Sequence, residues 1–237
     1  MKKNPFKLLT KFELRLWIIS CLLIFISFIF NSHRDILTLI ASITGATSLI
    51  YIAKGEAVGQ VLTVVFSILY AVISFKFRYY GEMITYLGMT GPIAFLSVIS
   101  WIRHPYKEGA GEVQVANMNP LKFFVLCILA AVVTGLFYFI MKYFGNANLA
   151  LSTVSITTSF LASGLMFLRS PFYAVAYACN DIVLIVLWIM ASVRDISYLP
   201  MIMCFVIFFI NDIYGFVSWK KMKVRQQNSY VAKELIN

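Results

Sequence analysis

The sequence predicts an all-α membrane protein in which eight helices cross the bilayer. Of its 237 residues, 61% are hydrophobic and 13% are charged, and the mean hydropathy is +0.84. A water-soluble domain of this size could not expose such a composition without aggregating. Apolar stretches long enough to cross about 30 Å of hydrocarbon occur at residues 16–30, 36–53, 57–75, 83–102, 121–143, 148–168, 171–191 and 198–219.

The basic residues divide unevenly between the two sides of these spans. With both termini on one side, that side collects fifteen Lys and Arg residues and the other side collects five, namely Arg34, Lys76, Arg78, Lys142 and Arg194. Cytoplasmic loops carry the excess of positive charge. The sequence therefore predicts cytoplasmic termini, and it assigns the net charge of +10 to membrane topology rather than to nucleic-acid binding.

The first span follows several lysines, as a signal peptide would. Phe28 and Phe30 occupy the positions where a cleavage site needs small residues, so we expect a retained helix. The cysteines, Cys21, Cys127, Cys179 and Cys204, all fall inside predicted spans. That placement favours reduced packing thiols over disulfides or a metal cluster, and no metal or cofactor is expected.

The chain divides into five predicted segments that contain two similar triples of helices. They are a basic segment with an extra span (1–34), a first three-helix repeat (35–102), a loop with a linker span (103–147), a second three-helix repeat (148–219) and a basic tail (220–237). Each repeat has a Ser/Thr-rich first helix and ends in Ser-Trp, at Ser100-Trp101 and Ser218-Trp219. Both triples begin on the same side, so the sequence predicts parallel repeats in a 1+3+1+3 arrangement.

The third span carries a polar stripe at helical spacing, consisting of Gln60, Thr63, Ser67, Tyr70 and Ser74. This stripe would form one wall of a central cavity if the two repeats face each other. Near the ends of spans, Glu56 is expected to pair with Lys54 in solvent, and Glu82 to be a loop charge or a residue at the mouth of a cavity. Trp101 and Trp219 are expected to be anchors at the membrane interface.

Two Asn-Asp-Ile triplets, at 180–182 and 211–213, interrupt the seventh and eighth spans. A carboxylate at bilayer depth costs about 3 kcal/mol, so such residues usually face a polar cavity. Helical spacing places one set of seventh-span residues on a shared face: Tyr173, Tyr177, Asn180, Asp181 and Trp188. Aromatic rings and an amide suit a flat polar ring such as that of a nucleoside or vitamin. The alternative is a non-transporting scaffold whose polar residues only join helices.

The eighth span presents two neighbouring faces. Asn211, Tyr214 and Ser218 share one, while Asp212, Gly215 and Trp219 form the other. Gly215 permits a close approach between helices, so Asp212 is either a substrate contact or an acceptor between helices.

Signals for catalysis are missing from the sequence. It contains no phosphate-binding loop of the G-x-x-x-x-G-K-[ST] type and no G-x-S-x-G elbow. The histidines, His33 and His104, both fall in predicted loops. These observations predict that the protein is not an enzyme and that its transport is not driven by nucleotide hydrolysis.

The sequence resembles the PnuC family of bacterial nicotinamide riboside transporters over nearly its whole length. The resemblance is carried by Tyr80-Gly81-Glu82, Pro92, Trp101, Arg169, the face from Tyr173 to Asp181, Trp188, Asn211-Asp212-Ile213-Tyr214-Gly215 and Trp219. It implies a bacterial cytoplasmic membrane protein similar in arrangement to SWEET sugar transporters, with substrate bound between the repeats. It also implies facilitated diffusion of a vitamin B3 nucleoside for NAD biosynthesis, trapping by an intracellular kinase, and a homotrimer.

The chain departs from this family in the turn before Asn180, where members tend to present tryptophans and this sequence has Tyr173, Ala176 and Tyr177. Other nucleosides or vitamins (deoxynucleosides, thiamine, riboflavin) therefore stay open as substrates. The prediction is a facilitative nicotinamide riboside transporter with the ring stacked on Tyr173 or Tyr177 and the carboxamide held by Asn180. The predicted substrate-binding residues are Asn180, Asp181, Tyr173, Tyr177, Trp188, Asn211, Asp212, Tyr214, Gln60, Ser67 and Tyr70.

Overall fold

The computed structural model describes residues 9–30, 35–107, 111–146, 148–193 and 195–234, with side chains described up to residue 229. Its α-helices are α1 (Lys11–Phe30), α2 (Ile36–Ala53), α3 (Ala57–Lys76), α4 (Tyr80–Thr85), α5 (Gly91–Arg103), α6 (Pro120–Tyr143), α7 (Leu149–Phe167), α8 (Tyr173–Ser192) and α9 (Leu199–Glu234). Eight segments of the described chain are long and apolar enough to span a membrane, which confirms the predicted all-α membrane fold with eight spans. His33, Arg34, Gly109 and Arg194 lie outside the described residues.

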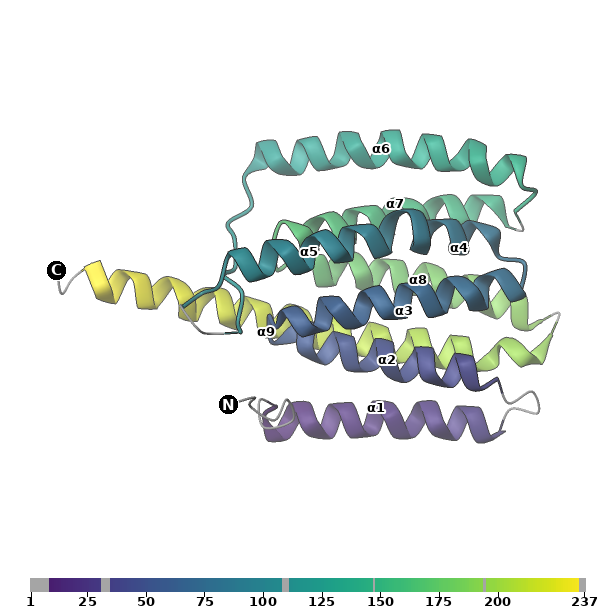
Figure 1. Cartoon of the computed structure of the whole chain (residues 1–237), viewed down its shortest axis with the longest axis horizontal. Helices are drawn as coiled ribbons and strands as arrows, with labels where there is room; N and C mark the ends of the chain where they lie inside the picture. Colours follow the sequence, from purple (N-terminus) through teal and green to yellow (C-terminus); the bar gives the residue numbers. More distant parts are fainter. Residues whose placement is uncertain (1–8, 31–34, 108–110, 147, 194, 235–237) are drawn as a thin grey trace.

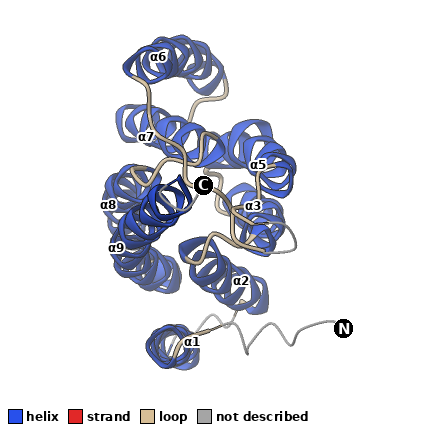
Figure 2. Cartoon of the chain, turned by 90° about the vertical axis from the view of Figure 1, so that its left-hand side faces the viewer, coloured by secondary structure: helices blue, strands red, loops and turns tan. Residues whose placement is uncertain are grey.

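Six of the spans form a closed ring. Neighbouring members contact one another in the order α2, α3, α4–α5, α7, α8, α9 and back to α2, as the view along the bundle shows (Figure 2). Side chains from all six members line its centre. This ring surrounds the candidate site described below.

Helices α1 and α6 lie outside the ring on opposite sides (Figures 1 and 2). Helix α1 packs on α2 and α9, and α6 packs mainly on α7. Only 17% of the α1 span and 11% of the α6 span are buried, so both present apolar side chains outward as lipid-facing helices do.

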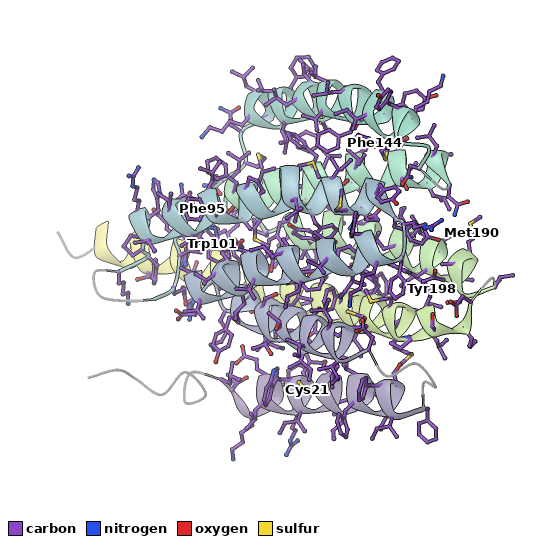
Figure 3. The ribbon with its side chains drawn as sticks, turned by 45° about the vertical axis from the view of Figure 1, so that its right-hand side comes forward. Cys21, Phe95, Trp101, Phe144, Met190 and Tyr198 are labelled. Carbon is purple, nitrogen blue, oxygen red and sulfur yellow. The ribbon has the colours of Figure 1, made fainter. Side chains whose placement is uncertain are left out.

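The two ends of the bundle differ in charge. The end that carries Lys54, Lys122, Lys220, Lys221 and Arg225 is called the basic end here, and the end that carries Asp35, Lys76 and Asp195 is called the distal end. Figure 3 labels Trp101 toward the basic end and Tyr198 toward the distal end. Both termini of the described chain lie at the basic end (Figure 1).

The fourth span is interrupted at its centre by a π-helical segment, Tyr86–Thr90, between α4 and α5. Pro92 has no N–H to donate to the carbonyl of residue 88, so regular α-helical bonding fails there. The Gly91 N–H donates instead to the Tyr86 carbonyl, five residues back. Such wide turns occur often at functional sites.

Trp101 and Trp219 are not the interface anchors that the sequence predicted. They are 2% and 0% exposed and their rings lie 5.4 Å apart inside the basic end. The last carbonyl groups of a helix lack partners within that helix. Each of these indoles donates a hydrogen bond to such a carbonyl at the end of a neighbouring helix.

Candidate functional site

A cavity lies at the centre of the ring, where several helices contribute to its wall. Its described lining is Ser48, Leu49, Ile52, Gln60, Thr63, Phe66, Tyr86, Thr90, Met166, Tyr177, Asn180, Asp181, Phe208 and Asp212. The volume is about 40 Å³, which suffices for water molecules. Pockets that hold drug-sized ligands measure about 300–1,000 Å³, so a nucleoside needs the ring to expand.

Asn180 on α8 is held by a cage of hydroxyl groups from α7. Its Oδ1 accepts hydrogen bonds from Thr158 at 2.8 Å, Ser159 at 2.9 Å and Ser155 at 3.5 Å. The side chain is 2% exposed. With the carbonyl oxygen occupied by α7, the amide N–H groups are the part of Asn180 that remains for a ligand in the cavity.

Asp181 and Asp212 bring two carboxyl groups to the same cavity. They come from the neighbouring helices α8 and α9, line the same cavity, and are each 3% exposed. Gly215 lets the helices approach, since a Cβ there would lie 2.9 Å from the Tyr173 Oη. Two carboxylates this close repel each other, and a cation beside them relieves that repulsion.

The cavity wall also contains polar atoms that have no hydrogen-bond partner among the described residues. They are Gln60 Nε2, Thr90 Oγ1 and Asp181 Oδ2. Unpaired buried groups cost free energy, so their gathering around one membrane cavity is typical of a site that pairs with a ligand or water.

Aromatic side chains close the cavity on its distal side. Tyr70 and Tyr86 meet edge to face with ring centroids 4.4 Å apart, and the Trp188 indole donates to the Tyr70 Oη at 3.0 Å. Tyr70 and Trp188 are both 0% exposed. Beyond this layer, a vestibule of about 200 Å³ opens at the distal end, with Asp35, Lys76 and Asp195 in its wall.

On the basic side, two pairs of crossed contacts close the ring. From α9, Ser218 Oγ donates to the Ala53 carbonyl at 2.7 Å and Trp219 Nε1 donates to the Ile52 carbonyl at 2.8 Å. The second pair has the same form: from α5, Ser100 Oγ and Trp101 Nε1 donate to the carbonyls at the end of α7, Phe167 at 3.4 Å and Met166 at 3.3 Å. We call these contacts the Ser-Trp clasps.

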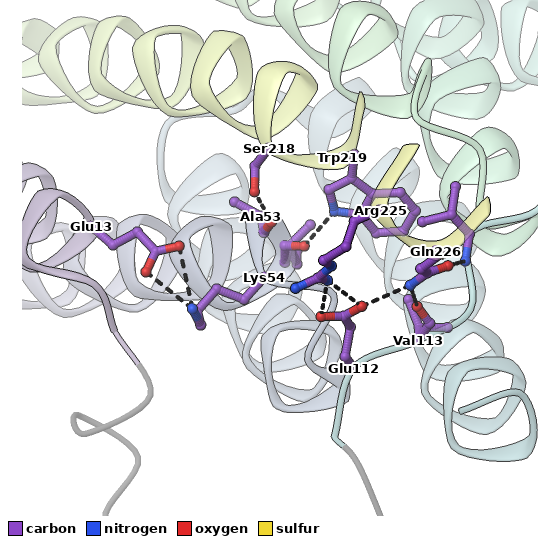
Figure 4. A network of polar contacts seen from close by, with 11 residues as sticks. Glu13, Ala53, Lys54, Glu112, Val113, Ser218, Trp219, Arg225 and Gln226 are labelled. Atoms are coloured by element: carbon purple, nitrogen blue, oxygen red, sulfur yellow. Dashed lines mark hydrogen bonds and ion pairs between the residues drawn. The ribbon is translucent and has the colours of Figure 1, made fainter. Parts of the chain in front are cut away.

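Ion pairs surround one of these clasps (Figure 4). The Lys54 Nζ lies 3.1 Å from Glu13 Oε2 of α1. Lys54 therefore pairs with Glu13 and not with Glu56, the partner that the sequence predicted. Glu112 in the 103–119 loop accepts from Arg225 and Gln226 of α9. Burial raises the pKa of the Glu56 carboxyl, Lys54 opposes that shift, and Glu112 adds to it.

The structure places the predicted site residues in several parts of the bundle. Gln60, Tyr177, Asn180, Asp181 and Asp212 line the cavity. Tyr70 and Trp188 belong to the distal aromatic layer, while Tyr173 packs on Trp219 at the basic side, 4.9 Å between centroids. Ser67 bonds within α3. Asn211 and Tyr214 turn toward α1, where they bond Ser20 and Glu13.

Several lining residues were not among the predicted ones, notably Ser48, Phe66, Tyr86, Thr90 and Phe208. Tyr86 and Thr90 are the first and last residues of the π-helical segment. The Gly91-Pro92 pair in mid-span was the sequence signal that could have identified this part of the wall.

Comparisons with known proteins agree with this architecture. The family model described as "Nicotinamide mononucleotide transporter" matches residues 35–221. The chain is 27% identical to the nicotinamide riboside transporter PnuC of Neisseria mucosa, over 84% of this chain and 76% of that protein. It is 23% identical to the nicotinamide riboside transporter PnuC of Haemophilus influenzae, over 80% and 81% of the two chains.

A solved structure shares the fold as well. The crystal structure of the vitamin B3 transporter PnuC superposes with a TM-score of 0.80 at 25% identity, covering 92% of this chain and 94% of that chain. Because the family model spans well over half of the sequence, the chain belongs to the nicotinamide mononucleotide transporter family.

Proposed function

We propose that this protein is a facilitative transporter of nicotinamide riboside. The observation that carries the proposal is the chemistry of the central cavity. Aromatic rings of Tyr86 and Tyr177 offer faces for a flat ring, Asn180 offers amide donors, and Asp181 and Asp212 offer negative charge. A pyridinium nucleoside with a carboxamide group uses all three features.

The charges of the cavity favour the nucleoside over its phosphate. No Lys or Arg is found among the described lining residues, while two carboxyl groups are present. A phosphate of charge near −2 would be repelled by these carboxyl groups and would lack the basic partners that phosphate sites use. A neutral deoxynucleoside would gain nothing from them, so thiamine, which is also cationic, is the strongest alternative substrate.

Alternating access is the mechanism that the barriers support. The cavity is bounded by the distal aromatic layer on one side and by the Ser-Trp clasps on the other. Substrate would pass when one barrier opens while the other stays closed. The crossed form of the clasps supports a pair of parallel repeats, 35–102 and 148–219, related by an axis along the membrane normal.

The excess of positive charge supports a location of the basic end and both termini in the cytoplasm of a bacterial cell. No phosphate-binding loop is found in the sequence, so we propose equilibration of the substrate followed by phosphorylation inside the cell. The outward apolar faces of α1 and α6 leave room for contacts between copies, and a homotrimer is proposed from the family resemblance.

The experiment that tests the function is uptake of radiolabelled nicotinamide riboside into proteoliposomes that contain the purified protein. We expect saturable uptake that ends at equal concentrations inside and outside, competition by unlabelled nicotinamide riboside, and no competition by nicotinamide mononucleotide. Preferential uptake of thiamine, riboflavin or thymidine would keep the site and change the substrate. No uptake of any of them would favour the scaffold alternative.

A further inference from the structure

Glu82 is a buried carboxyl group that lies outside the cavity lining. It is the third residue of α4 and 1% exposed, and neither carboxyl oxygen has a hydrogen-bond partner among the described residues. It is therefore not the loop charge that the sequence allowed. An ionisable residue without a partner inside a membrane bundle usually marks the path of a ligand or ion.

The start of α4 is fixed so that Glu82 stays inside the ring. The Gly81 N–H donates to Asn146 Oδ1 at 2.8 Å, and Asn146 Nδ2 donates to Ser152 Oγ at 2.8 Å. A Cβ at Gly81 would lie 2.8 Å from the Met141 sulfur. These contacts join α4 to α6 and α7, and rotating Glu82 outward would break them.

Glu82 lies directly behind the wall of the central cavity. It precedes Tyr86 by one helical turn, about 6 Å along the axis, and the Tyr86 ring packs on Tyr70 with centroids 4.4 Å apart. The Ser155 hydroxyl lies beside Glu82 and belongs to the cage that holds Asn180. Glu82 is thus one side chain away from both the aromatic layer and the amide of the site.

The buried Asp, Glu, Lys and Arg side chains of the ring are all acidic. Glu82, Asp181 and Asp212 are buried in it, and no Lys or Arg is buried among the residues that the structure describes. In a medium of low polarity, uncompensated negative charge attracts a cation strongly. We propose that Glu82 is a second recognition group for a cationic heteroaromatic ring, reached from the distal side of the cavity, which selects cationic over uncharged nucleosides.

This inference rests on the proposed function, and a pair of substrates of nearly equal shape separates the two. Nicotinamide riboside carries a positive ring, whereas its reduced dihydropyridine form is uncharged. In proteoliposomes, Glu82→Gln should lower uptake of the cationic form about tenfold or more at subsaturating concentration, mainly through a higher KM. Uptake of the reduced form should stay within about twofold, because it makes no ion pair. Glu82→Asp should restore part of the lost uptake.

Equal loss of both forms in Glu82→Gln would overturn the inference and leave a structural role for this residue. Unchanged uptake of the cationic form would overturn it as well, while the wild-type uptake would still support the proposed function. If the wild type takes up only the cationic form, the comparison is between the two variants. Uptake that is lost in Glu82→Gln and partly restored in Glu82→Asp supports the inference, and uptake that is lost in both variants overturns it. A wild type that takes up neither form overturns the proposed function and, with it, this inference.

Discussion

The two Asn-Asp-Ile triplets provide a matched pair of substitutions that test the site. Asn180 and Asn211 are each 2% exposed and each is hydrogen-bonded. The amide of Asn180 faces the cavity, whereas Asn211 Nδ2 donates to Ser20 at 3.2 Å and to the Ile207 carbonyl at 2.8 Å. Replacing either by Ala removes the same atoms from equally buried positions, and only Asn180 would contact substrate.

Asn180→Ala should weaken nicotinamide riboside binding by about 1–3 kcal/mol, since a buried polar group of the ligand would lose its partner. That corresponds to a Kd about 5-fold to 150-fold higher, measurable by calorimetry on the detergent-purified protein. Asn211→Ala should leave Kd within about twofold of the wild type, because α1 lies outside the ring. Both variants should lose stability, since each removes buried hydrogen bonds. Equal losses of affinity in the two variants, or none in folded Asn180→Ala, would refute the assignment.

Four further predictions concern stability, each measured by thermal unfolding in detergent. Trp219→Phe should cost about 1 kcal/mol by deleting its bond to the Ile52 carbonyl, and an unchanged melting temperature would count against the clasp. Gly59→Ala should cost about 1–3 kcal/mol, since its Cβ would lie 2.6 Å from the Ile52 nitrogen. Gly135→Ala, with nothing within 4 Å, should gain up to about 1 kcal/mol. Burial raises the pKa of Glu56 in the folded protein. Its contribution to the free energy of unfolding is therefore largest at pH values below the ordinary glutamate pKa of about 4.3, and it is lost as the pH rises. The stability of Glu56→Gln relative to the wild type should therefore increase as the pH rises from about 4. A difference in melting temperature that does not change with pH would contradict this prediction.

The fold followed from hydropathy because the bilayer fixes both the length and the composition of a span. All eight predicted spans correspond to helices that differ from them by a few residues at most ends. The π-helical segment did not follow, although Pro92 was visible in the sequence. Pro92 shows that regular helical bonding fails in mid-span. The close packing of Gly91 on Ser67 of α3, where a Cβ at Gly91 would lie 3.3 Å from the Ser67 Cβ, joins distant residues and has no local signature.

The site was only partly predictable because periodicity gives the face of a helix and not the depth along it. Tyr173 and Trp188 share the face of Asn180, yet they are 15 residues apart, or about 22 Å at 1.5 Å per residue. One face therefore reaches from the basic barrier through the cavity to the distal barrier. Periodicity did place Asn211 and Asp212 on different faces, since adjacent helical residues point in different directions, but it did not show that only the face of Asp212 lines the cavity.

The Ser-Trp clasp between α9 and α2 has a consequence for biosynthesis. Ser218 and Trp219 bond to Ala53 and Ile52 across separations of 165 and 167 residues, so the first helix of the ring is closed by the last one to leave the ribosome. Until α9 is inserted, the side of α2 that packs on α9 is uncovered in the membrane, and Asp181 lacks its neighbour Asp212. A nascent chain that stops before α9 therefore lacks both this clasp and Asp212. We expect quality-control proteases to degrade this incomplete bundle, so that truncation removes the protein instead of slowing its transport.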